Sequence, residues 1–154
     1  LSNKVKFKNK DKLFFVDKYY KPELPLNLTK YLLKFANSSI DVSDGLIDDL
    51  AKMINRQSLS FHLFENKIPV SNKLSNLIKK QRLNKINLIS NGDDYQVLFT
   101  ADIKKARIIQ KASKTTGIKI TKIGKIVSGK DRSLIFDEKG KQIQAKSKGY
   151  IHQF

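Results

Sequence analysis

The chain of 154 residues has no cysteine and no tryptophan, and it has only three prolines, seven glycines and one methionine. Without cysteine, disulfide bonds and cysteine-ligated zinc sites are excluded, which suits a reducing compartment. No apolar run approaches the ~18 residues that a membrane span requires, and no secretory signal pattern opens the sequence. We therefore expect a soluble, cytoplasmic protein without a membrane partner.

Acidic residues are also scarce, because 14 aspartates and glutamates face 31 lysines and arginines. The formal net charge of +17 favours contact with nucleic acid, anionic lipid or phosphorylated ligands. Only Arg56, Arg82, Arg107 and Arg132 are arginines, however, and proteins that read bases rely on the bidentate arginine fork. We interpret most lysines as solvated surface residues, and a basic module that binds RNA or another polyanion stays an alternative.

Length and a hydrophobic content of 40% predict one domain with a hydrophobic core. Period-two alternation in "KVKFKNK" predicts a strand near 4–8, and the prolines of "KPELP" predict an extended linker. Apolar spacing predicts helices at about 28–36, 44–57, 72–81 and 103–116. Shorter runs predict strands at 38–43, 59–68, 86–90, 96–101, 118–127, 133–138 and 141–144.

This mixture of elements lacks a strict βαβ rhythm and therefore predicts an α+β fold, a mixed, largely antiparallel sheet packed with helices. We divide the chain into an initial strand and linker, residues 1–27, and a main domain, residues 28–154. The turn "NGDD" between the strands expected at 86–90 and 96–101 predicts a hairpin.

The segment "SSIDVSDGLIDDL" carries four aspartates and no basic residue. If a strand leads into a helix here, Asp41 and Ser43 point to one side and Asp44 lies at the helix mouth. In the simpler interpretation Ser43 or Asp44 is an N-cap, and Asp48 and Asp49 are solvated first-turn acids. A cap does not need Asp41, so this residue favours a second interpretation.

The second interpretation is a magnesium site. Mg²⁺ prefers hard oxygen ligands and is usually held by one or two carboxylates together with phosphates and water. A helix N-terminus attracts phosphate through its free amides, but nearby carboxylates would repel that phosphate unless a cation lay between them. The segment therefore suggests a metal-bound polyphosphate and a phosphoryl-transfer reaction.

Two further segments have plain structural interpretations. In "SNGDDYQVLFT", Asn91 and Gly92 favour a tight turn from which Asp93 and Asp94 protrude, as in an ordinary hairpin. The closing "KGYIHQF" is typical of a final strand with aromatic side chains on one face. His62 and His152 have no partners at metal-ligand spacing, so we treat both as structural residues.

Together, "SSIDVSDGLIDDL", "ISNGDDYQVLFT", "IGKI" and "GYIHQF" occur in an order that resembles the C-terminal domain of thiamine-monophosphate kinase, a member of the aminoimidazole ribonucleotide synthetase-like superfamily. The similarity extends from about Tyr19 to Phe154 and includes the proline-containing "YYKPELPLNL". It implies that residues 28–154 are a C-terminal kinase domain with the fold of that superfamily. The family's N-terminal domain, which carries most of the magnesium aspartates, much of the ATP site and the dimer interface, lies outside the resemblance.

The resemblance implies transfer of the γ-phosphoryl group of ATP to thiamine monophosphate, giving thiamine diphosphate with Mg²⁺ as cofactor. It assigns Mg²⁺ binding to Asp41 and Asp44, ATP binding to Ser43, and substrate binding to Asp93 and Tyr150. It also implies that the domain is inactive without its N-terminal domain and that the complete enzyme is a homodimer. Related enzymes of the superfamily use other substrates, so another phosphotransferase or synthetase is an alternative.

Overall fold

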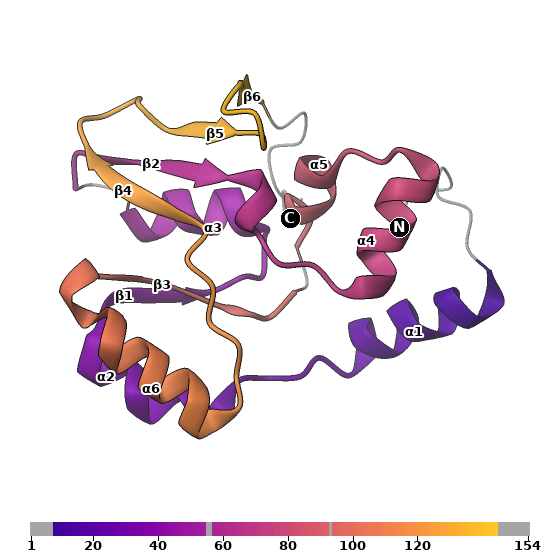
Figure 1. Ribbon diagram of the computed structural model, residues 1–154, viewed down its shortest axis with the longest axis horizontal. Coiled ribbons are helices and arrows are strands. Elements are labelled where there is room, and N and C mark those ends of the chain that lie inside the picture. Colours follow the sequence, from indigo (N-terminus) through magenta and orange to yellow (C-terminus); the bar gives the residue numbers. More distant parts are fainter. Residues whose placement is uncertain (1–7, 55–56, 93, 145–154) are drawn as a thin grey trace, which may run out of the picture.

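The computed structural model describes residues 8–54, 57–92 and 94–144. Figure 1 shows α1 projecting from a body built of strands and helices. The helices are α1 (Asn9–Tyr20), α2 (Thr29–Phe35), α3 (Leu46–Ile54), α4 (Asn72–Gln81), α5 (Lys85–Ile89) and α6 (Ala106–Thr116), with short 3-10 turns η1 (Leu26–Leu28), η2 (Glu65–Lys67) and η3 (Ile103–Lys105). The strands are β1 (Ala36–Asp41), β2 (Leu59–Phe64), β3 (Val97–Ala101), β4 (Gly124–Ser128), β5 (Leu134–Phe136) and β6 (Gln142–Ile143).

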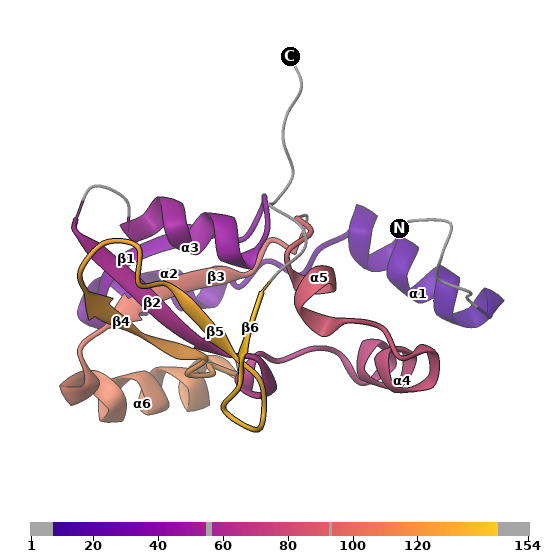
Figure 2. The same ribbon diagram turned by 90° about the horizontal axis from the view of Figure 1, so that it is seen from above.

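The described strands form two sheets. β1 pairs with β3 in an antiparallel ladder, and the other sheet has the order β4-β2-β5-β6, in which only the β2–β5 pair is parallel. Figure 2 shows α3 and α6 on opposite sides of the strands. The predicted α+β class with a mixed, largely antiparallel arrangement is therefore confirmed, although the strands are divided between two sheets.

Two groups of buried apolar side chains hold these layers together. The larger group joins α3 to the four-stranded sheet and to α5, and it includes Leu46, Leu50, Phe61, Leu63 and Ile86. A smaller group joins α2 to α6 under β1 and β3, where the Phe35 and Phe99 rings lie 5.2 Å apart. The first group fixes the N-terminal end of α3, where the aspartates of "DVSDG" lie.

Several elements lie where the periodicity placed them. α2, α3, α4, β1, β3 and α6 are present, and two side chains act as N-caps: Ser71 accepts from the Leu74 amide and Asp102 from the Lys104 amide. Gly117 ends α6 in the left-handed conformation, at φ +70°. Residues 21–25, which hold the two linker prolines, contain neither helix nor strand.

The predicted strand at 86–90 is wrong, because this segment is the helix α5. The Asn84 side chain accepts from the Asn87 amide as an N-cap, and Ile86 and Ile89 are buried at helical spacing. A five-residue apolar run does not reveal whether its period is helical or extended. The hairpin prediction fails with it, because the partner of β3 is β1.

Two other predicted strands are too long. β2 ends at Phe64, where the 3-10 turn η2 begins, and the run 118–127 is a strand only from Gly124 onward. The initial strand predicted near 4–8 falls almost wholly outside the described residues. The following residues form α1, which the sequence did not predict because its apolar side chains lack a strong helical periodicity. No helix in the described part of the chain is long and apolar enough to cross a bilayer.

Candidate phosphoryl-transfer site

The loop between β1 and α3 carries the aspartate-rich motif. Asp41 ends β1 opposite Val97 and is exposed to solvent, whereas Ser43 and Asp44 are half-buried. Gly45 has φ +122°, a conformation that side-chain-bearing residues rarely adopt, and its carbonyl accepts the Asp49 amide that opens α3. The loop therefore turns sharply from strand into helix, as the motif predicted.

The anchor of this loop is Asp49, which is only 1% exposed. Its Oδ2 accepts the backbone amides of Ser43 at 2.9 Å, Asp44 at 2.9 Å and Gly45 at 3.1 Å. The prediction of Asp49 as a solvated acid was wrong, because three orphan amides at the helix entrance supply the hydrogen bonds that a buried carboxylate needs. Consecutive backbone amides of this kind commonly bind an anion, and here the anion is the Asp49 carboxylate of the protein itself.

Lys52 connects this buried carboxylate to the predicted metal ligand Asp44. Its Nζ donates to Asp49 Oδ1 at 3.1 Å and to Asp44 Oδ2. The hydrogen bond to Asp44, the largest cause, raises the pKa of Lys52 above its ordinary value against the effect of burial. A positive charge, the Lys52 ammonium, therefore lies beside the Asp44 carboxylate. Neither Lys52 nor the buried role of Asp49 was predicted from the sequence, although their i,i+3 spacing on α3 was a usable signal.

The second motif, "SNGDD", packs directly against the first. A Cβ on Gly92 would lie 1.9 Å from the Ser43 carbonyl oxygen, and a Cβ on Gly45 would lie 2.3 Å from the Ser90 carbonyl oxygen. Both positions therefore require glycine, because each loop presents bare backbone to the other. The Ser90 side chain is buried and donates to the Ile86 carbonyl at 2.7 Å, which ties this loop to α5.

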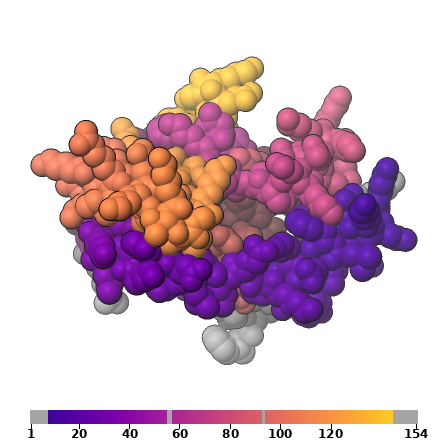
Figure 3. Space-filling model, turned by 60° about the horizontal axis from the view of Figure 1, so that its bottom comes forward, coloured from indigo at the N-terminus to yellow at the C-terminus, as the bar shows by residue number. Residues whose placement is uncertain are grey.

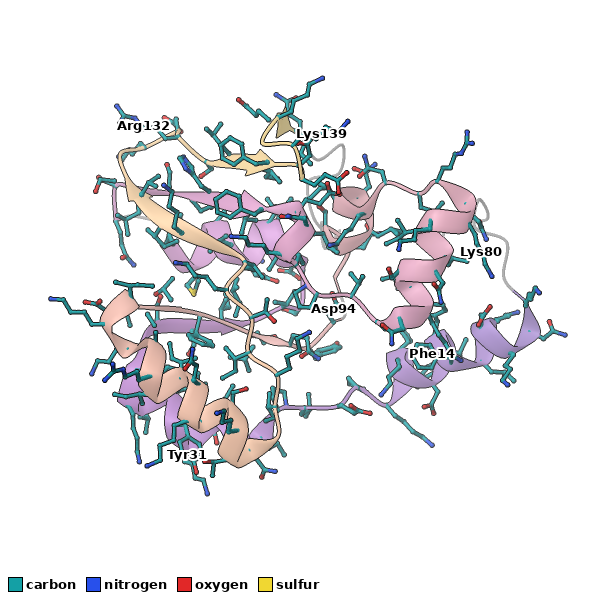
Figure 4. The ribbon with its side chains drawn as sticks, in the orientation of Figure 1. Phe14, Tyr31, Lys80, Asp94, Arg132 and Lys139 are labelled. Carbon is teal, nitrogen blue, oxygen red and sulfur yellow. The ribbon has the colours of Figure 1, made fainter. Side chains whose placement is uncertain are left out.

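Backbone hydrogen bonds extend the contact beyond the glycines. The Val42 amide donates to the Gln96 carbonyl at 2.8 Å, and the Tyr95 amide donates to the Val42 carbonyl at 2.9 Å. Tyr95 adopts a left-handed conformation at φ +50°, which turns the chain from the loop into β3. Asp94 precedes it, and Figure 4 labels this exposed residue near the middle of the molecule. Two motifs about fifty residues apart in sequence thus form one surface.

Some of the other residues singled out in the sequence lie outside the part of the chain that the structure describes. Asp93 and Tyr150, the predicted substrate ligands, lie outside the described residues, as does His152. His62 is half-buried on β2, with its ring 5.4 Å from that of Phe136, which agrees with a structural role. Across the described residues, no group of three or more histidine, cysteine, aspartate or glutamate side chains is arranged to hold a metal ion.

Comparisons with known proteins find relatives of this chain by sequence and by fold. No protein-family model matches the chain. A curated thiamine-monophosphate kinase from Buchnera aphidicola subsp. Schizaphis graminum is 32% identical over 140 residues, which are 90% of this chain and 42% of the relative. A thiamine-monophosphate kinase from Aquifex aeolicus is 33% identical over 89 residues, 57% of this chain and 29% of that relative.

The solved structures agree with these relatives. The structure of AaThiL complexed with AMPPCP and TMP has a TM-score of 0.72 and 28% identity, covering 96% of this chain and 43% of that chain. The crystal structure of thiamine monophosphate kinase from Aquifex aeolicus has a TM-score of 0.64 and 25% identity, covering 90% and 43%. The resemblance noted in the sequence is therefore confirmed: by sequence and by fold, this chain is a relative of the thiamine-monophosphate kinases and spans about two fifths of their length.

Proposed function

We propose that this chain is the C-terminal part of a thiamine-monophosphate kinase, which transfers the γ-phosphoryl group of ATP to thiamine monophosphate and yields thiamine diphosphate. The observation that carries this proposal is the contact between the two motif loops, where Gly45 and Gly92 let backbone lie against backbone. The two motifs that resemble the family thus meet at one place. A relative complexed with AMPPCP and TMP supports ATP and thiamine monophosphate as the substrates.

Within this proposal, each site residue has a role suited to its chemistry. Asp41 and Asp44 would hold Mg²⁺ through their carboxylates, and Ser43 would contact ATP. Asp93 and Tyr150 contact thiamine monophosphate, whose cationic thiazolium ring is attracted both to a carboxylate and to an aromatic face. Bound magnesium would neutralise phosphate charge during the transfer.

The described donor set fits magnesium in part. Asp41 is exposed, and Asp44 already holds a cation, the Lys52 ammonium, so a positive charge suits this position. Two carboxylates are what a protein usually contributes to Mg²⁺, and phosphates and water complete the octahedron. Asp49 is excluded as a ligand by its own role, because its Oδ2 already accepts three amides.

The chain spans less than half of its relatives, so a complete site needs more protein than is described here. We propose that the N-terminal part of the relatives supplies the remaining metal ligands and most of the ATP site. This chain alone is then inactive. A homodimer of the complete enzyme and a cytoplasmic location belong to the same proposal.

Calorimetric titration of this chain with thiamine diphosphate, with and without Mg²⁺, tests the binding half of the proposal. We expect binding that requires Mg²⁺ and is weakened by Asp44→Asn, whereas Asp48→Asn, a neighbouring half-exposed acid, serves as the matched control. In the complete enzyme, Asp44→Asn should abolish turnover while the protein stays folded. Normal turnover of that variant would contradict the assignment.

A second candidate function rests on the charged face formed by α2 and α6. These helices and η3 carry no acidic residue, and their exposed charged side chains are Lys30, Lys34, Lys104, Lys105, Arg107, Lys111 and Lys114. A polyanion bound there would lose affinity steeply with rising salt and would be indifferent to Mg²⁺ and thiamine. Repeating the titrations at two salt concentrations with a short single-stranded RNA distinguishes the two functions.

A further inference from the structure

The helix α1 and the segment that follows it form an arm with unusually exposed apolar side chains. No residue of α1 is buried, and Leu13 and Tyr20 are 70% and 75% exposed. Most of the large apolar side chains that the described chain exposes lie between residues 13 and 26, and these are Leu13, Val16, Tyr19, Tyr20, Leu24 and Leu26. An apolar concentration of this kind marks an interaction surface.

The exposed side chains have a helical arrangement. Leu13, Val16 and Tyr20 are spaced i, i+3 and i+7, so they share one face of α1. Phe14 points elsewhere, toward α4, where the Lys73 ammonium lies 4.4 Å from the centre of its ring (Figure 4). The contact with α4 therefore holds one side of the helix and leaves the apolar face open.

A large open hollow extends from the arm across the body, where β2, β3, β4 and α6 also line it, and Figure 3 shows it beside the indigo arm. Its volume is about 1990 Å³, and Val16, Tyr19 and Tyr20 of the arm line it together with Leu74 and Leu77 of α4. Small-molecule pockets are usually ~300–1,000 Å³. The hollow therefore suits a segment of folded protein better than a small ligand.

A helix of this length also needs more support than the contact with α4 provides. Helices shorter than ~12–15 residues are marginal in water, and α1 has 12 residues, none of them buried. The matched thiamine-monophosphate kinases carry more than half of their length outside the region that this chain covers. The size of the hollow and the apolar face of the arm both favour this additional part of the protein as the occupant.

We propose that the arm, residues 9–26, is the surface on which the N-terminal part of a thiamine-monophosphate kinase docks. This inference rests on the proposed function and adds the place of contact. The exposed face of α1 and the hollow beside it become interdomain core in the complete enzyme. A second copy of this chain is the competing occupant, and the experiment below separates the two.

Hydrogen exchange measured by mass spectrometry tests the docking directly. We compare this chain alone with a longer protein in which the residues preceding the match in the Buchnera aphidicola relative are joined to Leu1. In the chain alone we expect α1 amides to exchange within about tenfold of unfolded rates, and in the longer protein at least a hundredfold more slowly. A double variant, Leu13→Ser with Tyr20→Ser, should remove at least tenfold of that protection. Leu33→Ser, at an apolar residue 91% exposed on α2, is the matched control and should not.

Three outcomes would overturn the docking surface. These are strong protection of α1 in the monomeric chain alone, protection that rises with concentration together with dimerisation in sedimentation, and exchange in the longer protein as fast as in the chain alone. Kinase activity, measured on the same samples, separates this inference from the proposed function. An active longer protein with an unprotected α1 refutes the docking alone, whereas an inactive one with a protected α1 refutes the function alone.

Discussion

Replacing Asp49 tests whether one buried carboxylate holds the candidate site together. Each hydrogen bond from an amide to a charged group contributes about 1.5–3 kcal/mol, and Asp49 accepts three of them besides the ion pair with Lys52. These contributions do not add fully, because water enters the loop and Lys52 becomes solvated. We therefore expect Asp49→Ala to lower the free energy of unfolding by about 3–5 kcal/mol, as for a broken buried ion pair.

The isosteric change Asp49→Asn separates charge from shape. Its carbonyl oxygen can still accept amides, but hydrogen bonds to a neutral group are about half as strong, so we expect a loss of about 2 kcal/mol. Urea unfolding followed by circular dichroism gives both values, provided that the slope with denaturant is unchanged. Asp48→Asn, one residue away and half-exposed, should stay within about 0.5 kcal/mol of the wild type. If Asp49→Asn were as stable as Asp48→Asn, the role of Asp49 as the loop anchor would be refuted.

Two other predictions concern the same site. Gly92→Ala places a Cβ against the Ser43 carbonyl oxygen, a backbone atom that cannot rotate away, and should lower the free energy of unfolding in urea by about 3 kcal/mol. The control Gly117→Ala has open space around its Cβ and only an unfavourable φ, so it should lower that free energy by about 1 kcal/mol. Equal losses in the two variants would show that the two loops are not in contact. The pKa of Lys52 is raised in the folded protein, so its stabilising contribution is present below its ordinary pKa of 10.5 and is lost as pH rises through the higher folded value. Wild type should therefore lose stability relative to Lys52→Met as the pH rises above 10.5, and parallel stability curves would argue against the Asp44 contact.

Long periodic segments could be predicted from the sequence because their burial follows from their own spacing. The stripe of Leu46, Leu50 and Ile54 identifies α3 without any knowledge of its neighbours. The run at 86–90 is different, since five residues hold too little periodicity and a cap at Asn84 decides the outcome. The helix α1 has neither signal, so its prediction required the surroundings that would stabilise it.

The candidate site divides in the same way. The types of residue around Asp44 suggested magnesium binding, which stays a prediction, whereas the strand-to-helix turn was visible in the motif and is confirmed. The partition of the acids was not visible, because Asp48 and Asp49 look alike in sequence and only the latter faces the amide nest. The approach of the second loop depends on two close backbone contacts, at Gly45 and Gly92, between segments far apart in the chain. A local sequence pattern cannot reveal a contact between segments so far apart.

The aspartates of the motif consequently have different roles, although the sequence presents them as one negative cluster. Asp49 is committed to three amides and to Lys52, and its charge therefore stabilises the fold. Asp44 shares the Lys52 ammonium and can exchange it for another cation, whereas Asp41 already faces solvent at the end of β1. Two carboxylates are enough to hold one side of a magnesium ion but not to complete its six ligands. Under the proposed function these two carboxylates form part of a site, as expected of a chain that covers about two fifths of its relatives, and the proposed docking arm would bring the remaining part to them.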